Sequence, residues 1–143
     1  MIIEKSIEKK VNFLLENQAQ NMGTHLGIKF KKISKNELIA EMPVNEKSVQ
    51  PFRILHGGAS VALAETLCSI GAWINVSESE TAVGVEINAN HHCPVKEGGL
   101  VIATSTPVQR GKSIHVWETK IEDDRGKLVC TSKCTLAIIK KRK

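Results

Sequence analysis

The sequence predicts an α+β fold: one strongly curved antiparallel sheet of about six strands wrapped around one long buried helix, with a further helix at the N-terminus. Residues 59–76 form an apolar stretch of helical length, and four extended stretches follow it with no helix between them. Parallel strands need long crossovers, so these strands must be antiparallel. The chain has 143 residues, which suits a single domain over residues 1–143.

The first third of the chain shows one helical and two extended patterns. Apolar residues recur at helical spacing from Ile3 to Leu15, which predicts an amphipathic helix within residues 1–19 that ends near Asn17. Residues 21–24 break it. Residues 26–33 and 37–44 then have the pattern of two strands joined by a short turn.

A polar loop over residues 45–58 leads into the apolar stretch. A helix that is apolar on all sides is a buried helix, and about 18 residues would extend roughly 27 Å. The extended stretches after it are residues 82–92, 100–108, 113–122 and 128–140. A turn at residues 123–126 makes the last two a hairpin.

Composition and charge limit the classes of function. The formal net charge is +5, which favours anionic ligands such as phosphates, and part of it lies in a basic tail at residues 140–143. The sequence has no stripe of basic residues interleaved with aromatic residues, so it does not indicate nucleic-acid binding. No apolar run approaches the ~20 residues of a membrane span, and no signal peptide is visible, so we expect a cytoplasmic protein.

The four cysteines are expected to be reduced thiols, mostly in the core. Cys130 and Cys134 lie four residues apart in a predicted strand, which separates them by roughly 13 Å. A disulfide needs Cα atoms within about 7 Å, so these two cannot pair.

Glu65 is the anomaly of the apolar helix, because it is the one charged residue between Arg53 and Glu78. A buried carboxylate costs several kcal/mol unless it is paired, hydrated or protonated. One interpretation is an exposed stripe formed by Glu65 and Ser69. The apolar residues on every other face favour the second interpretation, a functional carboxylate that lines a cleft.

The tripeptide His56-Gly57-Gly58 directly precedes this helix. Glycines allow close approach of the backbone, and the first helical turn leaves N–H groups free. Such a turn can hold an anion or a developing oxyanion. An ordinary glycine-rich start of a helix is the alternative.

The spacing of Gly57 and Glu65 has a consequence for assembly. Eight helical residues span about 12 Å, so one reacting carbonyl can hardly touch both groups of the same helix. If both act on one substrate, the two groups must come from two subunits. The sequence therefore predicts a dimer with a shared active site.

Residues 50–66 resemble the signature of the hotdog-fold acyl-CoA thioesterases, and residues 25–28, 40–44, 84–92 and 111–117 add to the resemblance. Within that family the chain is most similar to the branch with the 1,4-dihydroxy-2-naphthoyl-CoA thioesterases of menaquinone synthesis and the phenylacetate-pathway enzymes. The resemblance covers about residues 20–139. It implies a hotdog fold, a homodimer or a dimer-of-dimers tetramer, and cofactor-free hydrolysis of an aryl or medium acyl-CoA thioester, with 1,4-dihydroxy-2-naphthoyl-CoA among the candidates.

The resemblance also implies roles for five catalytic positions. Glu65 would be the nucleophile or general base, and the Gly57 amide would polarise the thioester carbonyl. Gln50 and His56 would position the carbonyl or the thiolate side. Ser69 would orient Glu65 or the attacking water.

The resemblance also implies a second set of residues, which would bind coenzyme A, but this chain departs from the family at two nearby positions. Cys93 follows the histidine pair where relatives often carry Arg, and Arg53 stands where relatives often have Gly. By resemblance, the residues that contact the coenzyme are Gly84, His91, His92, Arg110, Gly111, Lys112 and Ser113.

Other functions compete with this one. A related hotdog dehydratase or hydratase would act at carbons beyond the carbonyl, whereas the glycine-rich start of the helix and Ser69 favour attack at the carbonyl. A non-catalytic acyl-CoA-binding protein has no use for a buried carboxylate. His91 and His92 are adjacent in a predicted strand and point to opposite faces, so they do not form a metal site.

Overall fold

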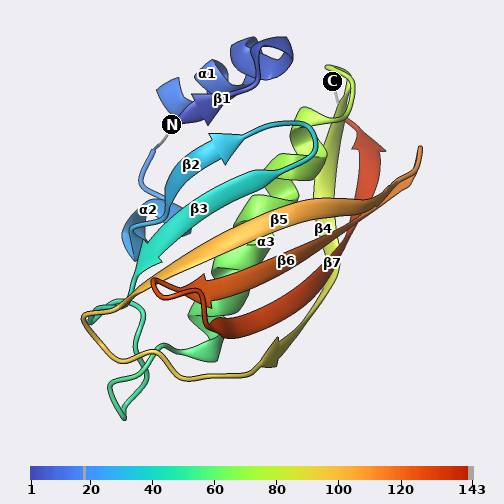
Figure 1. Cartoon of the computed structure of the whole chain (residues 1–143). Coiled ribbons are helices and arrows are strands. Elements are labelled where there is room, and N and C mark those ends of the chain that lie inside the picture. The colour runs from blue at the N-terminus through green and yellow to red at the C-terminus, as the bar shows by residue number, and fades with distance from the viewer. Residues whose placement is uncertain (18, 142–143) are drawn as a thin grey trace.

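A computed structural model describes residues 1–17 and 19–141 and shows a seven-stranded sheet curved around helix α3 (Gly57–Ile74) (Figure 1). The order is β1-β2-β3-β5-β6-β7-β4, and every pair is antiparallel except β1 with β2. This confirms the α+β class and the antiparallel second half. The strands are β1 (Ile2–Ile3), β2 (Lys29–Ile33), β3 (Leu38–Pro43), β4 (Glu80–His91), β5 (Leu100–Arg110), β6 (Ile114–Asp123) and β7 (Leu128–Lys140).

The N-terminal segment differs from the prediction. The two-residue strand β1 and a 3-10 turn (Lys5–Ile7) precede helix α1 (Glu8–Glu16), so α1 is shorter than predicted. A second helix, α2 (Met22–Leu26), occupies the segment predicted as a break and a strand start. Of the predicted basic tail, residues 142–143 lie outside the described part of the chain.

Local hydrogen bonds explain α2. The side chain of Asn21 accepts from the Thr24 amide at 3.0 Å, and the Thr24 hydroxyl accepts from the Asn21 amide at 2.9 Å. This reciprocal pair satisfies two amides that a helix start leaves free. Gly27 ends the helix with φ of 76°, a left-handed conformation that suits glycine. Strand β2 therefore begins only at Lys29.

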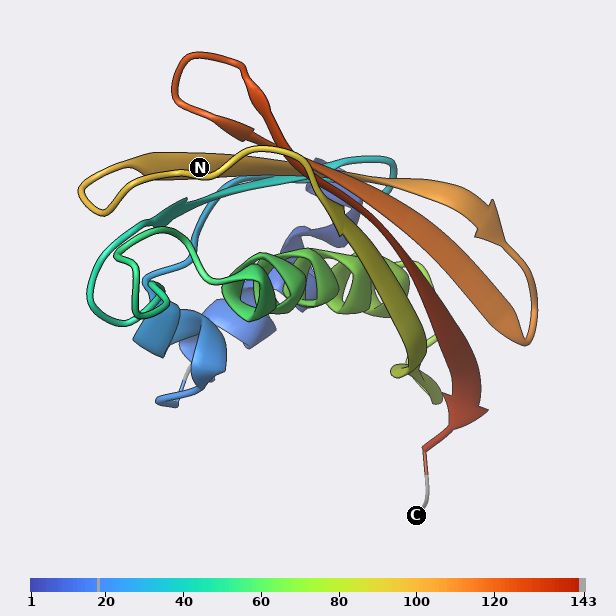
Figure 2. The ribbon, with the colours of Figure 1, turned by 90° about the horizontal axis from the view of Figure 1, so that it is seen from below.

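Helix α3 lies in the concave face of the sheet, with α1 and α2 beside it (Figure 2). A Cβ added at Gly71 would lie 2.8 Å from the ring of Trp117, so the glycine lets helix and sheet approach closely. The expectation of no membrane-length apolar run needs correction, because α3 is long and apolar enough by length and composition alone. Half of it is buried in the protein, where it is the core helix.

The β6–β7 hairpin and the cysteines agree with the predictions. The Asp123 carboxylate closes the turn by accepting from the amides of Arg125 and Lys127. All four cysteines are free, and every one except Cys93 is buried. A hydrogen bond with Cys68 and burial raise the pKa of the Cys134 thiol, so this thiol is protonated and unreactive.

Strand β4 forms one edge of the sheet. It pairs with β7 along its whole length, from Glu80 opposite Lys140 to His91 opposite Cys130. On its other side, no strand of the described residues follows it. Val83 and Val85 are 41% and 61% exposed on this edge. A long edge with unpaired backbone groups and exposed valines is a template for pairing with another chain.

Candidate active site

Glu65 lies midway along α3 and is half-buried, as is Ser69 one turn later. Its carboxylate is therefore neither sealed in the core nor on an open stripe. A Cβ added at Gly84 of β4 would lie 2.8 Å from Glu65 Oε1, so the carboxylate rests against the bare backbone of that strand. Gly84, expected from the resemblance to contact coenzyme A, is the neighbour of the candidate catalytic carboxylate.

An irregularity in β4 coincides with this contact. The β4–β7 register shifts between Gly84 and Glu86, which leaves Val85 outside the regular pairing. Bulges increase local twist and commonly occur beside functional sites. The strand thus deforms where it faces Glu65.

The start of α3 presents a backbone amide. His56 caps the helix: its Nδ1 accepts from the Gly58 amide at 2.8 Å, and its carbonyl accepts from the amides of Ala59 and Ser60. Among the hydrogen bonds of the described residues, the Gly57 amide is not used. Because Nδ1 of His56 is an acceptor, Nε2 carries the proton of the neutral ring. The Gly57 amide and the Nε2–H group of His56 are therefore two donors at the helix N-terminus, where the helix dipole favours negative charge.

A cavity of about 310 Å³ adjoins this helix start. A Cβ added at Gly57 would lie 2.8 Å from His91 Nε2, so the His91 ring lies directly over the glycine. The Gln50 side-chain carbonyl accepts from the Phe52 amide at 2.7 Å, which leaves the side-chain amide as a donor. The structure thus brings several expected site residues together here, and the lining includes Gln50, Gly57, Ser60, His91, His92 and Cys93.

Other expected residues lie elsewhere. Arg110 Nη1 donates to the Lys35 carbonyl at 2.9 Å and to Asn75 Oδ1 at 2.8 Å, at the C-terminal end of α3. Lys112 and Ser113 are exposed in the β5–β6 turn beside it. An 18-residue helix is about 27 Å long, so within one chain this group is far from His91 and His92.

Arg53 has an unusual backbone conformation in the loop before α3. Its φ is 59°, the left-handed region that costs a non-glycine residue about 1–2 kcal/mol. Arg53 pairs with Glu97, and its Nε lies 2.8 Å from Glu97 Oε2. The ion pair fastens the side chain over a turn whose backbone favours glycine.

Within residues 1–17 and 19–141, no group of three or more His, Cys, Asp or Glu side chains could hold a metal ion. His92 Nε2 lies 2.9 Å from the Thr131 hydroxyl, and His91 lies against Gly57. The adjacent histidines therefore have different partners.

Comparison with known proteins assigns the family. The model of the thioesterase superfamily matches residues 52–130, more than half of the chain. The chain belongs to the thioesterase superfamily. A 1,4-dihydroxy-2-naphthoyl-CoA hydrolase of Listeria monocytogenes is 48% identical over 118 residues, which cover 82% of this chain and 95% of that protein. The proofreading thioesterase EntH of Klebsiella pneumoniae is 42% identical over 82% of this chain and 85% of that protein.

A solved structure agrees with the family. The crystal structure of a thioesterase from Haemophilus influenzae matches with a TM-score of 0.81 at 42% identity, covering 92% of this chain and 90% of that one. The hotdog fold expected from residues 50–66 is thereby confirmed. This chain is therefore a thioester hydrolase, and the dehydratase and the purely binding alternatives are not supported.

Proposed function

We propose that this thioesterase-superfamily protein hydrolyses an acyl-CoA thioester to the free acid and coenzyme A. The observation that supports this best is a half-buried carboxylate, Glu65, on the core helix, together with the unused Gly57 amide at a helix N-terminus. We propose an aryl or medium-chain acyl group. The 48% identical relative that is named as a 1,4-dihydroxy-2-naphthoyl-CoA hydrolase makes that ester the first substrate to test.

The chemistry divides between two groups. The Gly57 amide donates to the thioester oxygen, and the His56 side chain adds a second donor nearby. Glu65 either attacks the carbonyl carbon itself or takes the proton of an attacking water. In either route the C–S bond breaks, and its electron pair leaves with the coenzyme A sulfur, which takes up a proton. If Glu65 has attacked, the acyl group remains as a mixed anhydride with Glu65, and water hydrolyses that anhydride to release the carboxylic acid. If Glu65 has deprotonated water, the hydroxide adds to the carbonyl carbon and the acid forms directly.

We further propose that two subunits share each site. Pairing of the β4 edge with its copy in a second subunit would be isologous and antiparallel. Two antiparallel α3 helices would then place the N-terminal end of one beside the middle and C-terminal end of the other. That arrangement would bring Gly57 of one subunit towards Glu65 of its partner. It would also bring His91 and His92 of one subunit towards Arg110 and Lys112 of its partner, whereas these two sets of residues lie far apart within one chain.

A dimer of such dimers would give the tetramer that the resemblance implies. We place the enzyme in the cytoplasm, where its four free thiols would persist.

Replacing Glu65 by Gln tests the function directly. The variant keeps the shape of the side chain but loses the nucleophile or base, so we expect kcat for 1,4-dihydroxy-2-naphthoyl-CoA or benzoyl-CoA to fall at least ~10²-fold. Release of coenzyme A is followed with a thiol reagent. Glu118→Gln, on the exposed outer face of β6, is the matched control and should hydrolyse like the wild type. Near-normal turnover by Glu65→Gln would end the proposed mechanism.

A further inference from the structure

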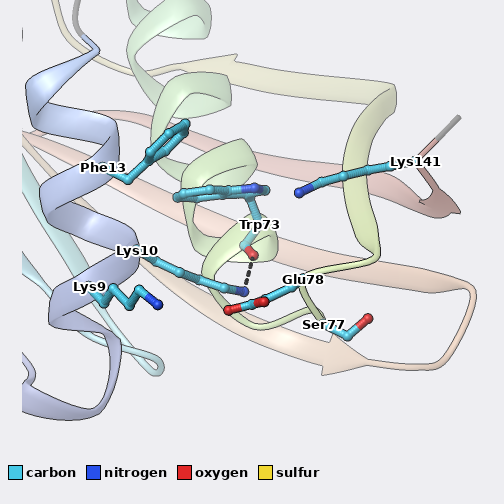
Figure 3. A pocket seen from close by; sticks show the side chains of 7 residues that line it. All are labelled: Lys9, Lys10, Phe13, Trp73, Ser77, Glu78 and Lys141. Carbon is cyan, nitrogen blue, oxygen red and sulfur yellow. Dashed lines mark hydrogen bonds between the residues drawn. The ribbon is translucent and has the colours of Figure 1, made fainter. Parts of the chain in front are cut away.

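A second hollow lies where α1 packs beside the C-terminal end of α3 (Figure 3). Its volume is about 320 Å³, within the range of small-molecule sites. Four segments that are distant in sequence meet there: α1, α3, the turn into β4 and the residue after β7. The lining residues that matter are Lys9, Lys10, Phe13, Trp73, Glu78 and Lys141.

Aromatic side chains form one wall of this hollow. The chain contains only three Phe, two Trp and no Tyr, yet Phe13 and Trp73 meet here (Figure 3). Phe13 is 61% exposed, and Trp73 is half-buried, whereas the other tryptophan, Trp117, is fully enclosed in the core. Exposed rings in a chain this poor in aromatics offer a surface on which a flat ring can stack.

The charge of the hollow is positive. Lys10 Nζ donates to the carbonyl of Trp73 in the last turn of α3 and to that of Val76 just after the helix, and it lies 5.6 Å from the centre of the Trp73 ring. Lys9 and Lys141 form no ion pair among the described residues. Burial lowers the pKa of Lys10, and the charge of Lys141 lowers it further. An anion would relieve this crowding of like charges.

We propose that this hollow binds an aromatic carboxylate of one or two fused rings. The ring stacks on Trp73 beside Phe13, and the carboxylate faces Lys141, whose side chain points toward the Trp73 ring (Figure 3). Glu78 also lines the hollow, so a carboxylate with one charge fits better than a phosphate with two.

Within one chain the hollow is separate from Glu65, because Trp73 lies eight residues beyond Glu65 on α3, about 12 Å along the axis. An aromatic acid is also what hydrolysis of an aryl-CoA ester releases. That connection to the product rests on the proposed function, whereas the binding itself does not.

The two tryptophans provide the assay. In a 15N-labelled sample, 1-naphthoate should shift the indole N–H resonance of Trp73 and leave that of the buried Trp117 in place. Naphthalene-1-methanol is the matched neutral probe, and we expect it to bind about tenfold more weakly or worse, because it lacks the charge-assisted hydrogen bonds. The titration is repeated in Glu65→Gln, where binding should be unchanged even though hydrolysis is lost.

Charge removal completes the test. The variant Lys141→Gln should bind 1-naphthoate no better than the neutral probe, while Lys127→Gln, which changes an exposed lysine in the β6–β7 turn, should bind like the wild type. Equal affinity of the wild type for the two probes, unchanged binding by Lys141→Gln, or absence of a Trp73 shift would each overturn the proposal. Displacement of naphthoate by adenosine 3′,5′-bisphosphate at lower concentration would also overturn it, in favour of a phosphate site.

Discussion

The carboxylate of Glu65 owes its position to the missing side chain of Gly84. A Cβ at Gly84 would lie 2.8 Å from Glu65 Oε1, closer than real Cβ contacts occur. We therefore predict that Gly84→Ala pushes the carboxylate away from its present place. Because misplacement of a catalytic group by about 1 Å can cost about 10²-fold, we expect kcat to fall at least about tenfold. Steady-state hydrolysis of an acyl-CoA ester measures this.

Thr81→Ala, on the same strand, is the control and should retain wild-type kcat. The melting temperature of Gly84→Ala should stay near that of the wild type, which separates displacement of Glu65 from unfolding. A folded Gly84→Ala variant with unchanged kcat would show that the carboxylate tolerates the shift.

Residue patterns predicted some roles and missed others. Glu65 and Gly57 stand out in the sequence because one breaks an apolar helix and the other precedes it. The contacts of Gly84 with Glu65 and of His91 with Gly57 join β4 to α3, and no spacing rule reveals such pairs. The ion pair of Arg53 with Glu97 connects residues 44 positions apart, so it could not be predicted from the sequence either.

At the scale of elements, long periodic segments were predicted well. The apolar stretch at residues 59–76 corresponds to α3, displaced by two residues, and the four extended stretches correspond to β4 to β7. The N-terminus was predicted less well. Helix α2 depends on the cap formed by Asn21 and Thr24, a five-residue element too short for periodicity to reveal. The two residues of β1 form a strand only because β2 lies beside them.

Strand β6 carries a pH-sensitive contribution to stability. Burial lowers the pKa of His115, and the charge of Arg110 lowers it further. The unfolded chain therefore binds more protons than the folded one as the pH falls through the ordinary histidine pKa of about 6.5, and the free energy of unfolding decreases. We predict that His115→Gln weakens this dependence. Urea unfolding at about pH 7.5 and about pH 5 compares the two proteins.

The exposed His25 is the control for this experiment. His25→Gln should leave the difference in unfolding free energy between the two pH values as it is in the wild type. An identical difference in His115→Gln would assign the acid sensitivity to other groups.

At the scale of the whole molecule, a single chain holds separate parts of the candidate site. The cavity at the start of α3 contains Gly57 and His91, whereas Glu65 faces β4 and Lys112 lies near the far end of the helix. The spacing of Gly57 and Glu65 predicted this separation, because helical rise is fixed. The sequence could not indicate which edge a second subunit would use, since the strand order depends on long-range pairing. The structure provides a candidate edge in β4.

Mixing two inactive variants tests the shared site. One carries Glu65→Ala, and the other carries Gly57→Pro, which removes the amide donor. In a mixed dimer, one site combines the two undamaged halves and the other is doubly broken. Random reassortment should restore roughly a quarter of wild-type activity, because half of the dimers are mixed and each has one of two sites. Coenzyme A release after subunit exchange gives the result.

Each variant alone should be folded and inactive. Subunit exchange is verified separately, for example with mass-tagged subunits. If exchange occurs and activity does not recover, each site is built within one chain.

The strand order also constrains how the protein is made. Helix α3 and strand β4 are synthesised before β5, β6 and β7, but β4 pairs only with β7, the last strand of the described chain. While the ribosome is still adding β5 and β6, the apolar face of α3 lacks its complete cover and β4 has no neighbour. A nascent chain is therefore most vulnerable to aggregation in its second half. Release of β7 closes the sheet, and only then does β4 exist as a finished edge.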